Sequence, residues 1–159
     1  MKIHPETKIG HIHLTVSNLE RSLGFYRDIL GFEVTDRFGN SAVFLSAGGY
    51  HHHIGLNTWA GEGAPRPPKG TIGLYHFAIL YPTRKELARA LEALIKAKYP
   101  VDGVSDHGVS ESIYLEDPDG IGIELYSDKP RSKWPKTKEG KLKMMTGLLD
   151  LKDLLSELK

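Results

Sequence analysis

The chain contains one structural unit twice, and this repeat constrains the fold more than any other feature. The first copy opens with "HIHLTVSNLERSLGFYRDILGF", where alternating apolar residues predict a strand and leucines at helical spacing predict a helix. Three strand patterns follow, "FEVTDRF", "SAVFLSA" and "YHHHIGLNTW". The second copy repeats this order with "HFAILYPTRKELARALEALIKAKY", "PVDGVSD", "ESIYLED" and "IGIELYSD". We therefore predict an α+β fold of two tandem βαβββ units, residues 8–70 and 71–130.

The predicted helices carry recognisable end signals. Ser17 and Glu20 have the spacing of a capping box, as do Thr83 and Glu86 in the second copy. Gly31 supplies a stop for the first helix, which we expect to run through Leu30.

The last part of the chain differs in composition from the two units. Residues 1–131 form the predicted domain, and residues 132–159 form a polar connector and a short helix that Asp150 can cap. A helix this short is unstable alone in water, so we expect it to dock on the body or on a second chain.

Bulk composition excludes several classes of function. The 159 residues carry a formal net charge of +1, which gives no reason to expect nucleic acid or an anionic membrane as a partner. The absence of cysteine rules out disulfides, thiolate zinc sites and a cysteine nucleophile. No apolar stretch approaches the roughly 20 residues that span a bilayer, and the first residues lack the apolar core of a signal peptide. We expect a cytoplasmic protein.

Two histidines and one glutamate stand at repeat-related strand positions: His11, His76 and Glu124. Two imidazoles and one carboxylate match the facial triad that holds non-haem iron and leaves positions open for substrate. Each residue also has an ordinary interpretation, as a satisfied strand histidine or a glutamate paired with a lysine. The repeat relation favours the metal site.

These segments together resemble a known superfamily. "HIHLTVSNLERSLGFYRDILGFEV", the second "HFAIL" and "IYLEDPDGIGIELYSD" are similar to the vicinal oxygen chelate superfamily of glyoxalases, extradiol ring-cleaving dioxygenases and bleomycin-type resistance proteins. The resemblance covers residues 8–128. It implies a curved mixed-sheet funnel around one divalent metal ion, with its ligand positions on His11, His76 and Glu124.

Within that superfamily, "YHHHIGLNTWAGEGAP", "DHGVSESIYLEDPDGIGIELY" and "PRSKWP" most resemble bacterial catechol 2,3-dioxygenase-like proteins. Those proteins usually carry a second pair of units after the connector, whereas this chain has one pair.

Three adjacent histidines, residues 51–53, raise the question of a further ligand. Matching Ile54-Gly55-Leu56 to Ile123-Glu124-Leu125 places Gly55 at the position of Glu124, where glyoxalases often have a fourth ligand. Strand alternation then predicts that His51, His53 and Asn57 face inward and that His52 points outward to the surface. His53 is either a substrate-orienting residue, a proton shuttle, a fourth ligand, or a polar wall without a role.

Four more residues complete the predicted site. Ser112 and Tyr114 share a face with Glu124, so the Tyr114 hydroxyl could bond a bound phenolate, although its match to Phe44 in the first copy favours simple packing. His107 is expected to serve as a general acid or base, because an imidazole can do both near neutral pH, and His13 is expected to line the pocket. Asp117, Asp119 and Gly120 are interpreted as turn chemistry. The predicted catalytic residues are thus His53, His107 and Tyr114, and the predicted substrate-binding residues are His13, His51, Asn57 and Ser112.

Three functions are compatible with these patterns. The favoured one is an Fe(II) or Mn(II) extradiol dioxygenase that cleaves a catechol-like diol. A glyoxalase-like lyase or isomerase using Ni, Co or Zn is the alternative, and a metal-free small-molecule binding protein ranks last because all three ligands are kept. We expect a small-molecule substrate, no nucleic acid or membrane partner, and a homodimer, since the resembling proteins usually pair two funnels.

Overall fold

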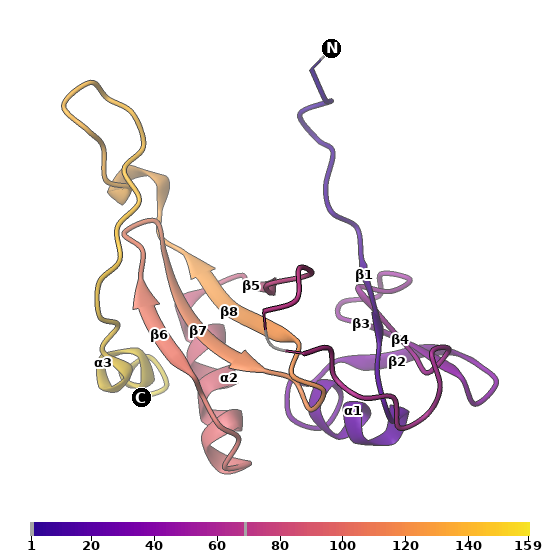
Figure 1. Cartoon of the computed structure of the whole chain (residues 1–159). Helices are drawn as coiled ribbons and strands as arrows, with labels where there is room; N and C mark the ends of the chain where they lie inside the picture. The colour runs from indigo at the N-terminus through magenta and orange to yellow at the C-terminus, as the bar shows by residue number, and fades with distance from the viewer. Residues whose placement is uncertain (1, 69) are drawn as a thin grey trace. The chain divides into compact units, whose positions relative to one another are not determined.

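The computed structural model describes residues 2–68 and 70–159. The chain divides into two compact units, Met1–Pro68 and Lys69–Lys159. Each unit has the element order strand, helix and three strands, and a short helix follows the second (Figure 1). The predicted α+β class and the repeat are confirmed. The joint funnel stays a prediction.

The first unit is a mixed four-stranded sheet with one helix. Its elements are β1 (Ile12–Thr15), α1 (Leu19–Tyr26), β2 (Glu33–Phe38), β3 (Ala42–Ser46) and β4 (Ile54–Asn57). The strand order is β1-β4-β3-β2, with β1 parallel to β4 and the other pairs antiparallel. The strand side chains that alternate toward α1 pack with Leu23 and Phe25 of that helix, and all are buried: Leu14, Val43, Leu45, Ile54 and Leu56. The opposite face of the sheet carries the histidines.

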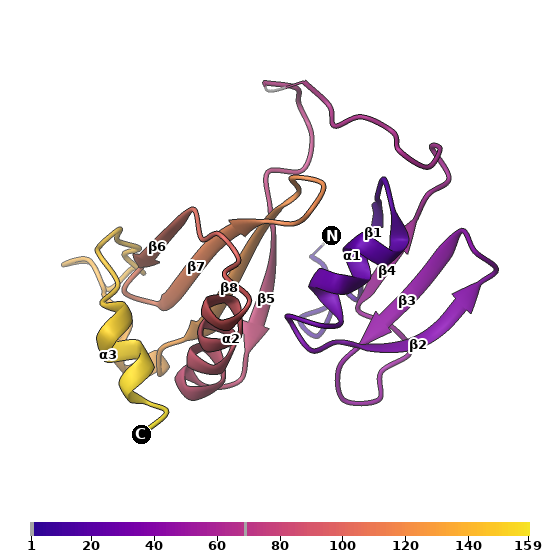
Figure 2. The same ribbon diagram turned by 90° about the horizontal axis from the view of Figure 1, so that it is seen from below.

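The second unit repeats this topology. Its elements are β5 (Phe77–Tyr81), α2 (Arg84–Lys96), β6 (Gly103–Asp106), β7 (Ser110–Glu116) and β8 (Gly122–Asp128), in the sheet order β5-β8-β7-β6. The helix α2 crosses one face of the sheet and packs on β5 and β8 (Figure 2). Its buried residues Leu87, Leu91 and Leu94 share the core with Ile113, Leu115, Ile123 and Leu125. Glu124 therefore points to the face away from α2.

The end signals were predicted correctly in the second unit and shifted by one residue in the first. Thr83 caps α2, and its Oγ1 accepts a hydrogen bond from the Glu86 amide at 3.2 Å. The cap of α1 is Asn18 and not Ser17, because the Asn18 side chain accepts the Arg21 amide at 2.8 Å. The helix α1 also ends earlier than predicted, at Tyr26.

Two turns follow the predicted chemistry. Gly31 has the predicted left-handed conformation, with φ +83°, but it lies beyond the end of α1 at Tyr26 and so does not terminate that helix. In the turn between β7 and β8, the Asp117 carboxylate accepts the amides of Asp119 and Ile121, both at 2.8 Å. This turn fixes the register of β7 against β8.

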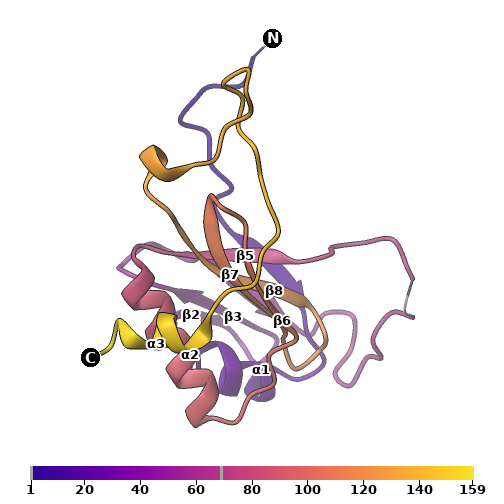
Figure 3. The same ribbon diagram turned by 90° about the vertical axis from the view of Figure 1, so that its left-hand side faces the viewer.

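The C-terminal segment docks on the second unit. After a single 3-10 turn, Arg131–Lys133, it runs beside the edge of β6 and ends in α3 (Leu151–Ser156), which lies against α2 (Figure 3). As predicted, Asp150 caps α3, and Leu154 is buried. Among the described residues, no helix is both long and apolar enough to cross a membrane.

Candidate metal-binding and catalytic site

The repeat places His11 and His76 at equivalent positions, each directly before the first strand of its unit. The registers also correspond, because His13 pairs with Gly55 across β1 and β4 as Ala78 pairs with Glu124 across β5 and β8. Gly55 is therefore the structural equivalent of Glu124, as the sequence match predicted.

The pair His13 and Gly55 explains why the first unit has no carboxylate there. A Cβ atom on Gly55 would lie 2.9 Å from two atoms of the His13 ring, closer than side chains approach. The ring of His13 therefore occupies the space that Glu124 fills in the second unit, where the partner residue is the small Ala78. In the first unit the large residue, His13, is on the first strand and the small one, Gly55, is on the fourth. In the second unit the small residue, Ala78, is on the first strand and the large one, Glu124, is on the fourth.

A hydrogen-bonded chain of side chains lies on the open face of the second sheet. The His76 Nε2 atom is 3.1 Å from Glu124 Oε2. The Tyr114 hydroxyl oxygen lies 3.0 Å from the other carboxylate oxygen, Oε1, which can accept its proton. The side chain of Glu124 is 14% exposed and that of His76 is 31% exposed, so the pair is open on one side to a ligand.

His107 extends this chain from the turn between β6 and β7. Its Nε2 atom is 2.6 Å from the Tyr114 hydroxyl, and its Nδ1 atom is 3.0 Å from the carbonyl oxygen of Met145. Burial raises the pKa of Tyr114, and the Glu124 carboxylate raises it further against an opposing effect of Ser112. Tyr114 is thus held as a neutral phenol between a carboxylate and an imidazole.

His52 does not point outward, and that prediction was wrong. Its ring is partly buried, 4.4 Å from the ring of His11 and 5.1 Å from that of Phe44. Burial lowers the pKa of His52, and the nearby imidazoles of His11 and His51 lower it further. The prediction failed because β4 begins only at Ile54, so strand alternation does not extend back to the histidines.

His53 lies on the predicted face, but its Nδ1 atom is already engaged. The Ala47 amide donates to this atom at 3.3 Å, and the Ser46 hydroxyl lies 3.0 Å from it. In a neutral ring the proton is then on Nε2, which leaves neither nitrogen free as a ligand. This arrangement does not favour His53 as a fourth ligand.

The remaining predicted residues have mixed surroundings. His51 is exposed, with its Nδ1 atom 2.7 Å from Nδ1 of His52. The buried Asn57 uses its side-chain oxygen to accept the Trp59 amide at 3.0 Å, which is a local structural role. Ser112 is fully buried on the Glu124 face, and its hydroxyl makes no hydrogen bond of ordinary geometry with any described residue.

Sequence reasoning missed neighbours of the predicted site, Trp59 and Met145 among them. The Trp59 ring centroid lies 5.2 Å from that of His13, and an aromatic residue just after a strand could have been noticed. Met145 contributes a backbone carbonyl, which has no signature in a sequence.

A family model described as the Glyoxalase/Bleomycin resistance protein/Dioxygenase superfamily matches residues 8–125. The chain belongs to this superfamily. Among the curated members, a catechol-2,3-dioxygenase of Bacillus subtilis (strain 168) is 44% identical over 155 residues, covering 98% of this chain and 53% of the relative. A manganese-dependent 2,3-dihydroxybiphenyl 1,2-dioxygenase of Geobacillus genomosp. 3 is 32% identical and covers 86% of this chain and 41% of the relative. The chain spans about half the length of these two relatives.

Solved structures of superfamily members share the fold. Virulence protein STM3117 of Salmonella typhimurium is 26% identical, with a TM-score of 0.58, and the match covers 81% of this chain and all of that one. A glyoxalase/dioxygenase of Nostoc punctiforme has a TM-score of 0.63 at 22% identity, with 82% and 98% of the two chains covered. The second likeness shows the fold alone.

The donor atoms of the second unit suit the metal ion that the superfamily resemblance implies. Two ligand atoms at about 2.1 Å from one cation, at a right angle, lie about 3.0 Å apart. The observed 3.1 Å between His76 Nε2 and Glu124 Oε2 matches that separation. No group of three metal-binding side chains is present among residues 2–68 and 70–159, and the third predicted ligand, His11, belongs to the first unit.

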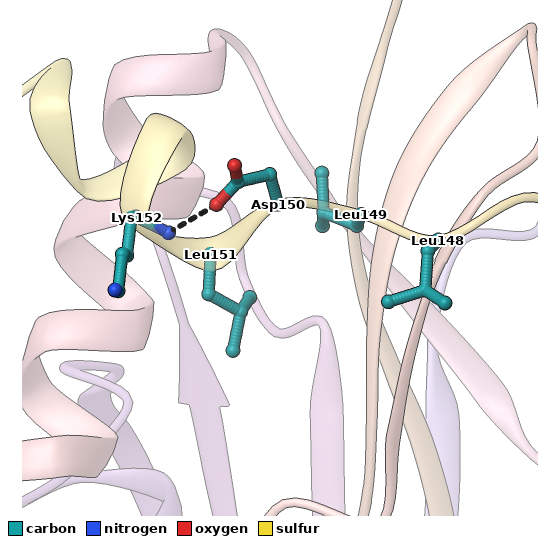
Figure 4. A pocket seen from close by; sticks show the side chains of 5 residues that line it. All are labelled: Leu148, Leu149, Asp150, Leu151 and Lys152. Carbon is teal, nitrogen blue, oxygen red and sulfur yellow. Dashed lines mark hydrogen bonds between the residues drawn. The ribbon is translucent and has the colours of Figure 1, made fainter.

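A surface hollow at the start of α3 is a different feature from this site. It is lined by residues 148–152, and its one carboxylate, Asp150, accepts the Lys152 amide at 2.8 Å (Figure 4). The lining contains no histidine and its carboxylate serves as a helix cap. The superfamily site is therefore not in this hollow.

Proposed function

We propose that the protein is a divalent-metal-dependent extradiol dioxygenase that cleaves a catechol-like diol. The observation that carries the proposal is the chain His76–Glu124–Tyr114–His107, which sets a phenol and an imidazole beside a pair of metal-type donors. The names of the two curated relatives, which mention catechol and 2,3-dihydroxybiphenyl, support the same substrate class.

In this proposal His11, His76 and Glu124 hold the ion. Fe(II) is favoured, and Mn, Ni, Co or Zn suit the same donors. When bound, such an ion would hold the two oxygens of a diol and lower the pKa of its hydroxyl groups.

The other residues act on the substrate. Tyr114 relays a proton: its oxygen accepts a hydrogen bond from a diol hydroxyl, while its own proton passes to Nε2 of His107. His53 orients the substrate, because its Nδ1 atom is engaged and its Nε2–H can donate a hydrogen bond. His13, His51 and Asn57 line the substrate space, Asn57 with the part of its amide that Trp59 leaves free. Ser112 is fully buried and acts on the substrate only through its neighbour Tyr114 on the same sheet face.

A glyoxalase-like lyase or isomerase is the second candidate, because the superfamily includes glyoxalases. Gly55 supplies no fourth ligand and His53 is already hydrogen-bonded, so the dioxygenase ranks first. Metal-free binding of a small molecule ranks third, since all three proposed ligands are retained.

The test compares metals and substrates on one preparation. Untagged full-length protein is stripped of metal, reloaded anaerobically with Fe(II) or Mn(II), and mixed with catechols in the presence of O2. We expect ring-cleavage product and matching O2 consumption, both absent from a Glu124→Gln control. Turnover of a hemithioacetal with Ni or Co, without any O2 uptake on catechols, would instead identify the lyase.

We also propose that the protein is a cytoplasmic homodimer. The absence of cysteine supports the location. Three apolar residues of the second unit support association because they are exposed: Ile72 (100%), Leu74 (56%) and Leu80 (52%).

A further inference from the structure

The C-terminal segment pairs with the end of β6 through its main chain. Asp106 and Gly147 exchange two backbone hydrogen bonds, of 2.9 and 2.8 Å, and the Met145 amide donates to the His107 carbonyl at 3.0 Å. Residues 143–147 (the clamp segment) therefore lie along the strand edge as an added antiparallel strand would. Figure 1 shows the yellow chain passing beside β6 on its way to α3.

The clamp segment is fixed at both ends. Upstream, the Lys143 amide donates to the Pro135 carbonyl at 2.9 Å. Downstream, Leu149 and Leu154 are buried. The Arg84 guanidinium of α2 bonds Asp153 at 2.6 Å and Glu157 at 2.8 Å, so α3 is tied to the body. A segment held in this way can set the position of a side chain that contacts it.

The contact with His107 also selects a ring tautomer. A carbonyl oxygen only accepts hydrogen bonds, so the Nδ1 atom of His107, 3.0 Å from the Met145 carbonyl, must carry the proton of the neutral ring. The Nε2 atom is then an acceptor, and it lies 2.6 Å from the Tyr114 hydroxyl. Tyr114 has one proton, which faces both this nitrogen and the Glu124 carboxylate.

We propose that the clamp segment is a positioning element of the candidate site, in which the Met145 carbonyl holds His107 as the Nδ1–H tautomer with Nε2 ready to accept from Tyr114. The role of this tautomer in turnover rests on the proposed function. The tautomer itself does not, because it is a property of the folded chain.

The test reads the tautomer directly by long-range ¹H–¹⁵N correlation spectra of metal-free, full-length, ¹⁵N-labelled protein. Spectra are recorded at about pH 8.5, roughly two units above the usual imidazole pKa of about 6.5. The His107 signals are assigned by their loss in His107→Gln. We expect the Nδ1–H tautomer in the unmodified protein, and finding His107 there as the Nε2–H tautomer would overturn the proposal.

A matched pair of variants tests the clamp segment itself. Met145→Pro removes the amide that donates to His107, whereas Met145→Ala keeps the backbone and removes only the half-exposed side chain. We expect Met145→Ala to retain the Nδ1–H tautomer and Met145→Pro to lose it in favour of a mixture, with the other histidine signals unchanged. A folded Met145→Pro protein that keeps the pure Nδ1–H tautomer would show that the clamp segment does not position the ring. If Met145→Pro does not fold, the tautomer of His107 in the unmodified protein still tests the proposal.

Turnover separates the two proposals. A protein that shows the expected tautomers but no ring cleavage would refute the proposed function and leave the clamp intact. Ring cleavage by a protein in which His107 is the Nε2–H tautomer would support the proposed function and refute the clamp proposal.

Discussion

Glu124 is the residue on which the candidate site depends, because its two oxygens face different partners, His76 and Tyr114. Glu124→Ala should abolish stoichiometric metal binding and lower turnover by more than the roughly 10- to 100-fold that loss of an outer partner costs. The fold should persist, since this carboxylate is outside the apolar core. Elemental analysis and circular dichroism measure both effects. A variant that still binds one metal ion per chain would contradict the ligand assignment.

Tyr114 acts through its hydroxyl, which touches both Glu124 and His107. Tyr114→Phe removes only that group. We expect kcat to fall roughly 10- to 100-fold while metal content stays stoichiometric, because the outer partner is lost and the ligands are kept. Steady-state kinetics on metal-loaded protein check this, with Tyr126→Phe on the same sheet face as the control. Equal losses in both variants would indicate a general packing effect.

Tyr81 makes the free energy of unfolding depend on pH in the alkaline range. Burial raises its pKa to about 12, from a usual value near 10. The folded chain keeps the phenol proton where the unfolded chain has lost it, so the stabilisation is complete below about pH 10 and disappears as pH rises to about 12. At about 1.4 kcal/mol per pKa unit, the loss is at most about 2.8 kcal/mol. Urea unfolding at several alkaline pH values should show that the free energy of unfolding declines less steeply with pH in Tyr81→Phe than in the unmodified protein. The same decline in both proteins would be evidence against the burial effect.

At the scale of elements, the close packing of His13 on β1 against Gly55 on β4 can be tested by changing the size of each residue. Gly55→Ala brings a methyl group within 2.9 Å of the His13 ring and should destabilise the fold by about 1–3 kcal/mol. His13→Ala removes the obstacle, so the double variant should recover most of that loss. Urea unfolding of the four proteins measures the coupling. Additive losses would mean that the ring moves aside easily.

Regular elements were predictable from the sequence, and irregular segments were not. The long strands β7 and β8 alternate without interruption across a tight turn, so the shared face of Glu124 and Tyr114 followed from their spacing. The direction of the His52 side chain could not be predicted in this way, because residues 51–53 are outside β4 and do not follow its alternation of side chains. Asn18 replaced Ser17 as helix cap because both side chains can accept an amide, and spacing alone does not choose between them.

The site contacts made by the backbone were also beyond sequence reasoning. Every residue has a carbonyl, so nothing in the letters marks Met145 as the partner of His107. The shared face of Glu124 and Tyr114 was predicted, whereas the hydrogen bonds that join them to His76 and His107 and reach the C-terminal segment required the structure.

At the scale of the whole molecule, the proposed homodimer predicts a concentration-dependent mass. The exposed Ile72, Leu74 and Leu80 would be covered on association, so sedimentation velocity should show a dimer at micromolar concentration. Leu80→Lys, on the open face of the second sheet, should weaken it, and Ile95→Lys on the helix α2 is the control. A protein that remains monomeric at high micromolar concentration would show the prediction to be wrong.

The edge strands β2 and β6 are protected from pairing with other chains in different ways, and this bears on aggregation. An unpaired strand edge is a template for pairing with other chains. The edge strand β2 carries Glu33, Asp36 and Arg37 and an irregular register between Val34 and Asp36, which discourage such pairing. The edge strand β6 has a single charged residue, Asp106, and its own C-terminal segment pairs there instead. Proteolysis or mutation that releases this segment would therefore leave the backbone edge of β6 free to pair with other chains. Colloidal stability and solubility should then fall before the core itself unfolds.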